Sequence, residues 1–83
     1  RGNIQLTDQA RTSAYDNFGW DIKDICLALL ALPIKDCYQS EPRFGNPYIW
    51  VDYYRSKDLK GENVYTHFYV DSGNLIIDSF KEI

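Results

Sequence analysis

A change in hydrophobic pattern at Pro33 constrains the fold of this chain more than any other feature of its sequence. Before Pro33, every residue of segment 26–32 is apolar, and apolar residues recur at helical spacing from position 22. After it come three segments rich in aromatic and β-branched residues, separated by turn-forming residues: 48–54, 64–70 and 75–80. Because proline cannot continue a helix, the sequence predicts a helical first half and a stranded second half, which is an α+β fold.

Two helices are predicted in the first half. Thr7 is a suitable N-cap for a helix that runs to about Phe18. Asp21 has the same role for a second helix, which ends before Pro33. Since segment 26–32 is apolar on all sides, we expect this second helix to pack against the sheet and to be buried by several neighbours.

The second half predicts three or four antiparallel strands that follow one another in a meander. Segment 36–41 is a candidate edge strand in addition to the three aromatic segments. Segment 42–47 has the composition of a loop, with two prolines and a glycine. Near the N-terminus, Ile4 and Leu6 alternate with polar residues and predict a short extended segment.

Loop length in the last hairpin decides which side chains share a face of the sheet. A three-residue loop, Asp71–Gly73, would bring six side chains to one face: Tyr65, His67, Tyr69, Ile77, Ser79 and Lys81. A two-residue turn, Ser72–Gly73, would instead pair His67 with Asp78 and direct Lys81 to the opposite face. Asp and Gly suit the longer loop, which is therefore the one we expect.

Length and composition limit the class of protein. A chain of 83 residues forms one domain, and its 45% hydrophobic and 16% aromatic content is enough for one core. Cys26 and Cys37 match no disulfide framework or metal motif. The sequence has neither an uncharged apolar run of membrane-spanning length nor a signal-peptide pattern, so we expect a cytoplasmic protein. A net charge of −3 argues against general affinity for nucleic acids but does not exclude a local basic site.

Four side chains in the second half are suited to cleaving RNA without metal: Arg55, Tyr65, His67 and Lys81. Attack by the RNA's own 2′-hydroxyl needs a proton acceptor, a cation for the charged phosphorane and a proton donor for the departing 5′-oxygen. The alternative is structural: a hydrogen-bonded strand histidine, packed tyrosines and a solvated lysine at a strand end. The sequence contains no Gly-rich phosphate loop, nucleophile elbow or Cys/His cluster that would support nucleotide hydrolysis, acyl transfer or zinc chemistry.

Four short segments follow one another in a specific order: Asp36-Cys37-Tyr38-Gln39-Ser40, Ile49-Trp50-Val51-Asp52-Tyr53-Tyr54-Arg55, Val64-Tyr65 and Ser79-Phe80-Lys81-Glu82. This order resembles the pattern of the MqsR family of mRNA interferase toxins. The resemblance covers the chain from about Gly2 to Ile83, and the second and fourth segments are its most specific parts.

Members of that family have a RelE-like fold, cut single-stranded mRNA without a cofactor and are neutralised by a cognate antitoxin protein. The resemblance therefore implies two N-terminal helices packed on a three- to four-stranded antiparallel β-sheet. It also implies a metal-independent endoribonuclease whose partners are mRNA and an antitoxin. The family's first helix would precede Arg1, so residues 1–83 are interpreted as a single toxin domain that lacks it.

The resemblance assigns roles to individual residues. Tyr65 and Lys81 match family positions linked to activity, which implies that they act on the scissile phosphate. His67 falls where a lysine is common, which keeps a group able to carry positive charge, and is the candidate acid or base. Arg55 matches the basic end of its strand and, with Arg43, would position the RNA backbone.

Two positions depart from the family pattern. Gln39 is assigned to RNA binding, although the family usually has a lysine there, and Val51 stands where a glutamine is usual. Such changes lower affinity for phosphate and alter the bases preferred. Together with the acidic net charge, they motivate an alternative function, a non-catalytic protein-binding module that keeps the toxin fold.

Overall fold

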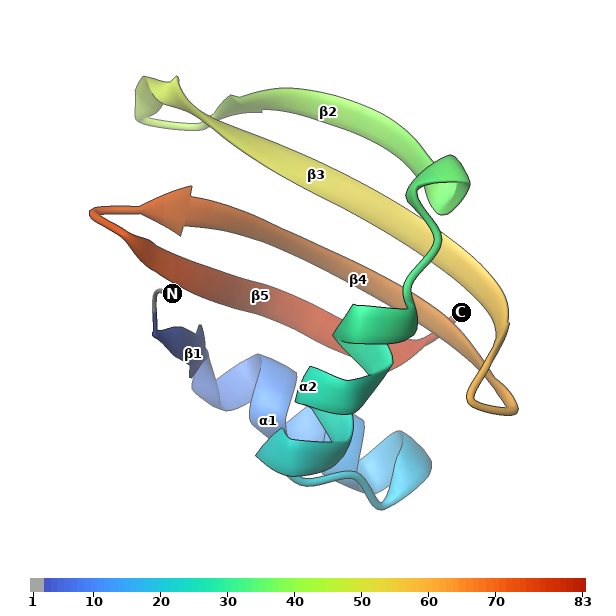
Figure 1. Cartoon of the computed structure of the whole chain (residues 1–83). Coiled ribbons are helices and arrows are strands. Elements are labelled where there is room, and N and C mark those ends of the chain that lie inside the picture. The colour runs from blue at the N-terminus through green and yellow to red at the C-terminus, as the bar shows by residue number, and fades with distance from the viewer. Residues whose placement is uncertain (1–2) are drawn as a thin grey trace.

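Five strands form a single mixed sheet in the order β1-β5-β4-β3-β2 (Figure 1). The computed structural model describes residues 3–83. Arg1 and Gly2, where the resemblance to the toxin family begins, lie outside the described residues. The strands have these bounds: β1 Ile4–Leu6, β2 Cys37–Arg43, β3 Asn46–Leu59, β4 Glu62–Asp71 and β5 Asn74–Glu82. β1 is parallel to β5, and every other neighbouring pair is antiparallel. The predicted α+β class is confirmed, and the extended segment predicted at Ile4 joins the sheet as β1.

Two helices, α1 (Asp8–Phe18) and α2 (Ile22–Ala31), precede β2 as predicted. The Thr7 hydroxyl oxygen accepts a hydrogen bond from a first-turn N–H of α1. Asp21 and Asp24 form a reciprocal capping box at the start of α2. Both caps satisfy backbone N–H groups that have no partner within the helix. Among residues 3–83, no helix is long and apolar enough to cross a membrane.

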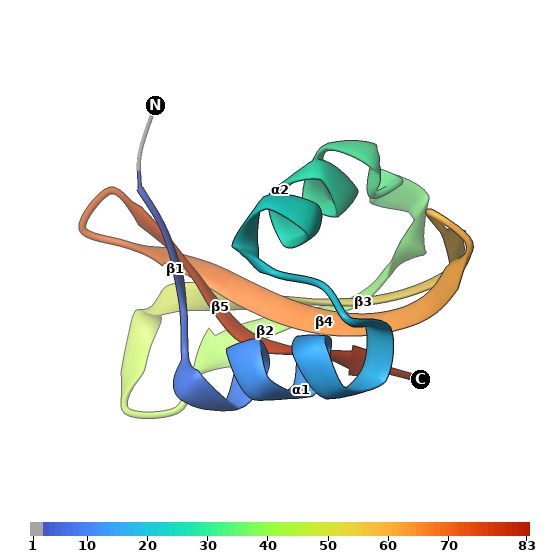
Figure 2. The same ribbon diagram turned by 90° about the horizontal axis from the view of Figure 1, so that it is seen from below.

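β1 covers only the first part of β5, and α1 lies along the rest of that edge (Figure 2). The Thr7 hydroxyl donates to the carbonyl oxygen of Asp78 at 3.2 Å, and the backbone N–H of Glu82 donates to Asn17 Oδ1 at 2.8 Å. These bonds satisfy backbone groups of β5 that would otherwise be left at an open sheet edge. α1 is thereby fixed beside the C-terminal half of β5.

α2 packs on one face of the sheet and supplies Ile25 and Ala28 to the core. The other buried members of this core cluster come from α1 and the sheet: Ala10, Ala14, Leu59, Val64, Ile77 and Phe80. The prediction that α2 is buried by neighbours on several sides is wrong, since Leu27 is 54% exposed and Leu30 is 85% exposed. The apolar run is wider than the helix face that contacts the sheet, and its outer side is open to solvent in the described part of the chain.

The β4–β5 hairpin contradicts the predicted three-residue loop. Asp71 pairs with Asn74 across a two-residue turn, in which Ser72 (φ 53°) and Gly73 (φ 79°) both have positive φ. Positive φ at both central positions is the type I′ geometry, whose twist matches that of the flanking strands. Type I′ turns favour glycine or asparagine at the first central position, but here serine adopts the required positive φ. The match in twist therefore selects the shorter turn.

A β-bulge farther along the same hairpin changes the pairing. Phe68 pairs with Ile77, but the next residue back along β4, His67, pairs with Ser79. Asp78 is therefore an extra residue in β5, with no residue of its own opposite it. Two residues of β5, Asp78 and Ser79, lie against a single histidine of β4.

Because of the bulge, four of the side chains that the longer loop would have brought to one face of the sheet still lie on the same face. Tyr65 lies opposite Lys81, and His67 lies opposite Ser79, so the predicted grouping of these four side chains is confirmed. Ile77 is the exception, because it lies before the bulge and is fully buried in the core under the helices. Its predicted place beside Tyr65 is wrong.

The predicted loop at 42–47 is also wrong, because β2 and β3 continue into it. Pro42 pairs with Trp50, and only the turn Phe44–Gly45 separates the two strands. Proline lacks a backbone N–H, but β2 is the edge strand of the sheet, where that missing donor disrupts no ladder on its outer side.

Candidate active site

The face of the sheet opposite α2 carries two rows of side chains that run across three strands. Arg55 of β3, Tyr65 of β4 and Lys81 of β5 are paired in one row. The next row along the strands has three further members: Tyr53, His67 and Ser79. Because successive residues of a strand alternate between faces, each row lies two positions from the other and both project to the same side.

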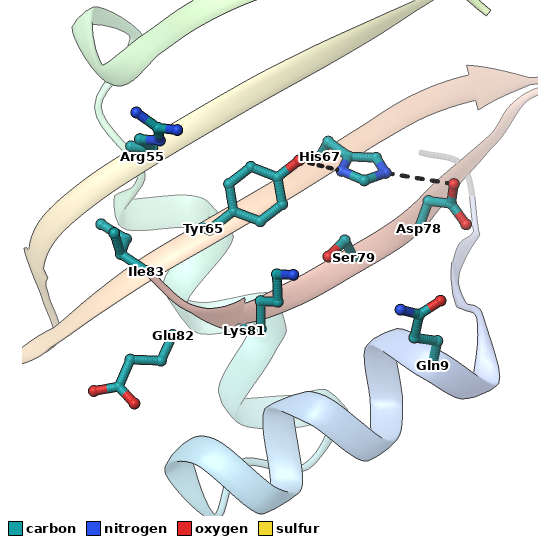
Figure 3. Close-up of a pocket in the computed structure, with 9 residues that line it drawn as sticks. All are labelled: Gln9, Arg55, Tyr65, His67, Asp78, Ser79, Lys81, Glu82 and Ile83. Atoms are coloured by element: carbon teal, nitrogen blue, oxygen red, sulfur yellow. Dashed lines mark hydrogen bonds and ion pairs between the residues drawn. The ribbon is translucent and has the colours of Figure 1, made fainter. Parts of the chain in front are cut away.

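All members of these rows except Tyr53 line a cavity of about 410 Å³, and Gln9 of α1 contributes to its wall (Figure 3). Three residues predicted to be catalytic, Tyr65, His67 and Lys81, meet in it together with Arg55. A cavity of this size is sufficient for a small ligand or one nucleotide unit. The sequence-based grouping of a phenol, an imidazole and two cations therefore corresponds to one site in the structure.

A chain of polar contacts joins three of the cavity side chains. Tyr65 Oη lies 2.8 Å from His67 Nδ1, and His67 Nε2 lies 3.4 Å from Asp78 Oδ2 (Figure 3). A carboxylate can only accept, so the partners assign the ring proton to Nε2 and leave Nδ1 to accept from the Tyr65 hydroxyl. Both ring nitrogens of His67 are then engaged, and the imidazole reaches any ligand through the oxygen of Tyr65.

Burial raises the pKa of Tyr65 above its ordinary value of 10.0. The neighbouring phenols of Tyr38 and Tyr53 raise this pKa further, whereas the guanidinium of Arg55 lowers it. The net direction is upward, so Tyr65 carries its proton at neutral pH. This protonation state agrees with its role as donor to His67.

Two cations of the site are available to an anionic ligand. The ammonium nitrogen of Lys81 lies 5.5 Å from the centroid of the Tyr65 ring, and the guanidinium carbon of Arg55 lies 4.7 Å from that of Tyr38. Within residues 3–83, neither cation forms an ion pair with a carboxylate. Aromatic rings hold both groups in place without neutralising their charge.

Arg43 and Gln39, predicted to bind RNA, lie outside this cavity. The guanidinium carbon of Arg43 lies 4.6 Å from the centroid of the Tyr69 ring, at the β2–β3 hairpin. Gln39 Nε2 donates to Glu41 Oε1 at 2.8 Å. The structure places both residues on the β2 side of the same face, next to the catalytic candidates rather than among them.

A family model described as "Motility quorum-sensing regulator, toxin of MqsA" matches residues 1–82 of the chain. The chain belongs to the MqsR toxin family. The mRNA interferase toxin MqsR of Escherichia coli (strain K12) is 33% identical to it over 81 residues, which span 98% of this chain and 80% of that relative. The family predicted from the order of four short segments is confirmed.

Asp78 and Gln9 are among the polar residues of the cavity that the sequence did not assign to the site. The sequence pairs Asp78 with His67 only in the alternative two-residue turn, and that turn is the one the structure contains. Gln9 lies on the exposed side of α1, and no sequence pattern connects this helix face to the cavity. In this member of the MqsR toxin family, the bulge supplies His67 with its carboxylate partner.

Among residues 3–83, no group of three or more His, Cys, Asp or Glu side chains is arranged to hold a metal ion. His67 and Asp78 are two such side chains, and they contact each other, with Nε2 3.4 Å from Oδ2.

Proposed function

We propose that this MqsR-family chain is a metal-independent endoribonuclease, an mRNA interferase toxin of a type II toxin-antitoxin system that cleaves single-stranded mRNA. The observation that carries the proposal is the meeting of Tyr65, His67 and Lys81 in one cavity beside Arg55. The name of the Escherichia coli relative, mRNA interferase toxin, supports RNA as the substrate.

The proposed reaction begins with proton transfer through Tyr65. Its oxygen accepts the proton of the 2′-hydroxyl, while its own proton moves to Nδ1 of His67. The 2′-oxygen bonds to phosphorus, the bond from phosphorus to the 5′-oxygen breaks, and a 2′,3′-cyclic phosphate remains. The carboxylate of Asp78 offsets the charge of the resulting imidazolium.

Lys81 and Arg55 have complementary roles in this proposal. The ammonium group of Lys81 stabilises the charge on the phosphorane and gives a proton to the departing 5′-oxygen. Arg55 holds the non-bridging phosphate oxygens, for which its planar guanidinium is suited. These roles need cations that are not already paired, which agrees with the contacts of both side chains in the described structure.

A cleavage assay on single-stranded RNA in the presence of EDTA tests the proposal. Tyr65→Phe, His67→Ala and Lys81→Ala are each expected to lower the cleavage rate about a hundredfold, because each removes a proton-transfer or charge-stabilising group. Tyr15→Phe, which removes a phenol 67% exposed on α1, is the matched control and should cut like the wild type. Unchanged cleavage in all three cavity variants would remove this site from the reaction.

The proposal also includes a protein partner, an antitoxin of the kind that the family description names. The alternative function, a non-catalytic protein-binding module, is favoured by the net charge of −3 and by the engagement of Gln39 with Glu41. Growth arrest on expression, relieved by the product of an adjacent gene, is expected for the toxin. Absence of both toxicity and RNA binding at low salt would support the module instead.

A further inference from the structure

A second concavity, of about 680 Å³, lies beside the catalytic cavity at the β2–β3 hairpin. His67 and Asp78 belong to the walls of both, so the two are continuous across this pair. We name it the hairpin subsite and define it by six residues: Glu41, Arg43, Phe44, Val51, Tyr53 and Tyr69.

We propose that the hairpin subsite binds one unpaired nucleobase of the RNA, next to the scissile phosphate, and selects bases that carry an exocyclic amino group. This inference rests on the proposed function for its substrate class. It adds a recognition site that the catalytic mechanism does not require.

The walls of the hairpin subsite suit a flat ring. Val51 and Tyr69 form a buried floor, 6% and 9% exposed, and the guanidinium of Arg43 stacks over the Tyr69 ring at 4.6 Å. Phe44 is fully exposed at the tip of the hairpin, so its ring is free to cover a bound base. Unstacked bases are held in this way, between aromatic side chains and guanidinium planes.

Glu41 supplies the group that would recognise the base. Its Oε1 accepts a hydrogen bond from Gln39 Nε2 at 2.8 Å, and its Oε2 accepts one from the Tyr53 hydroxyl at 3.1 Å. These two donors fix the orientation of the carboxylate and leave further lone pairs on each oxygen. A fixed carboxylate that can only accept is suited to N–H groups on a base edge.

Both cavities contain charges of both signs, but their cations have different surroundings. The catalytic cavity has the carboxylates of Asp78 and Glu82 and the cations Lys81 and Arg55, neither of which forms an ion pair within residues 3–83. In the hairpin subsite the one arginine, Arg43, lies flat over the Tyr69 ring. The backbone phosphate is therefore expected beside the two cations of the first cavity, and a base against the flat groups of the second.

The acceptor-only chemistry of Glu41 also predicts which bases are selected. Adenine, cytosine and guanine each present an exocyclic amino group, whereas uracil presents only its single ring N–H and two carbonyl oxygens. Those carbonyl oxygens would face the carboxylate without a hydrogen between them. Uracil is therefore the base that the hairpin subsite disfavours.

Cleavage-site mapping on RNA of random sequence tests the selection. In the wild type, one position adjacent to the cut should be depleted in uracil about tenfold. Glu41→Gln should abolish this depletion, because the amide can donate to uracil, while the cleavage rate falls much less than in Tyr65→Phe. Glu62→Gln, which removes the same charge at the distant β3–β4 turn, is the matched control and should keep the depletion. An identical base profile for wild type and Glu41→Gln, with cleavage intact, would overturn the subsite but not the proposed function.

A binding experiment distinguishes failure of the hairpin subsite from failure of the proposed RNA cleavage. Tyr65→Phe protein labelled with ¹⁵N is titrated with the dinucleotides ApA, CpC, GpG and UpU, and amide shifts are followed at Val51 and Tyr69. Tighter binding of the first three than of UpU, lost in the double variant with Glu41→Gln, would support the subsite even if the wild type proved unable to cleave RNA. Equal binding of all four dinucleotides, or no shifts at these amides, would overturn it.

Discussion

At the scale of single residues, Asp78 differs from the other carboxylates of the chain by its position beside His67. Its side chain is 46% exposed, yet its Oδ2 lies 3.4 Å from Nε2 of a histidine that is 21% exposed. A carboxylate at this nitrogen favours the tautomer in which Nδ1 accepts from Tyr65. Asp78 is thus a positioning residue, which acts on the substrate only through His67 and Tyr65.

Asp78→Asn is expected to lower the cleavage rate about tenfold to a hundredfold while leaving the fold intact. The asparagine amide can donate to Nε2, which would stabilise the opposite tautomer and turn Nδ1 into a donor that Tyr65 cannot use as a proton acceptor. The ¹⁵N chemical shifts of the two ring nitrogens of His67 report this change directly.

Asp16→Asn, which removes an exposed carboxylate of α1, provides the control for the loss of charge. It should change neither the ring shifts of His67 nor the cleavage rate. If Asp78→Asn lowered activity while the tautomer of His67 stayed the same, the positioning role would be excluded.

At the scale of elements, one extra residue in β5 decides the composition of the site. The pairs on either side of it, Phe68 with Ile77 and His67 with Ser79, would be neighbours in a regular ladder if Asp78 were absent. Deletion of Asp78 should therefore preserve the pairing of Tyr65 with Lys81, seen as cross-strand nuclear Overhauser effects. Activity should fall about as far as in Asp78→Asn, and loss of the cross-strand contact would contradict this account of the bulge.

Thr66 stabilises the strand segment at the bulge from the buried face. Its side chain is fully buried, and its hydroxyl donates to the carbonyl oxygen of Ser79 at 2.6 Å. Thr66→Val keeps the shape but removes the donor, which should lower the free energy of unfolding by about 1–3 kcal/mol in urea denaturation. Thr12→Val, at an exposed position of α1, should change it by less than about 0.5 kcal/mol. Equal effects of the two substitutions would show that the buried hydrogen bond contributes nothing.

The helices and strands could be predicted from the sequence more reliably than the turns and bulges that set the register between strands. Caps at Thr7 and Asp21 and the alternation in β3 and β4 are local patterns, and the structure contains them where the patterns lie. The sequence offers the turn Ser72–Gly73 only as the less favoured alternative, because both loop lengths use the same residues and their energies differ by strand twist rather than by composition. A bulge leaves still less trace, since a single extra residue such as Asp78 alters neither composition nor periodicity measurably.

At the scale of the whole molecule, the sheet has one covered face and one polar, aromatic face. The prediction for α2 was wrong at this scale. An apolar run shows that a helix has a large apolar surface, but not how many neighbouring elements pack against that surface. The site was predictable as a set of residue types, since Tyr65, His67 and Lys81 occur at spacings that alternation can bring to one face. Gln9 and Asp78 line the cavity, and Glu41 lines the hairpin subsite, through tertiary placement, which single-sequence patterns do not encode.

Three half-buried tyrosines give the molecule a defined sensitivity to alkali: Tyr53 and Tyr65 on the polar face and Tyr54 on the covered face. Burial is the first cause that raises the pKa values of Tyr53, Tyr54 and Tyr65 above the ordinary 10.0, and the nearby carboxylate of Glu41 adds to the effect at Tyr53. As the pH rises above 10, these phenols lose protons first in the unfolded chain, so the folded state holds more protons than the unfolded one. The stability that is present below pH 10 is therefore lost as the pH rises through the raised values.

Urea denaturation at pH 9 and pH 11 measures this loss, and the midpoint should be lower at pH 11. Tyr54→Phe keeps the ring that stacks on Phe68 at 5.3 Å but removes one of the three phenols, so its midpoint should fall less between the two pH values. Tyr48→Phe removes a phenol that is 92% exposed and is expected to leave the difference as in the wild type. If Tyr54→Phe lost as much stability as the wild type, its phenol would have the same proton affinity in both states, and burial of the ring would not account for the alkaline transition.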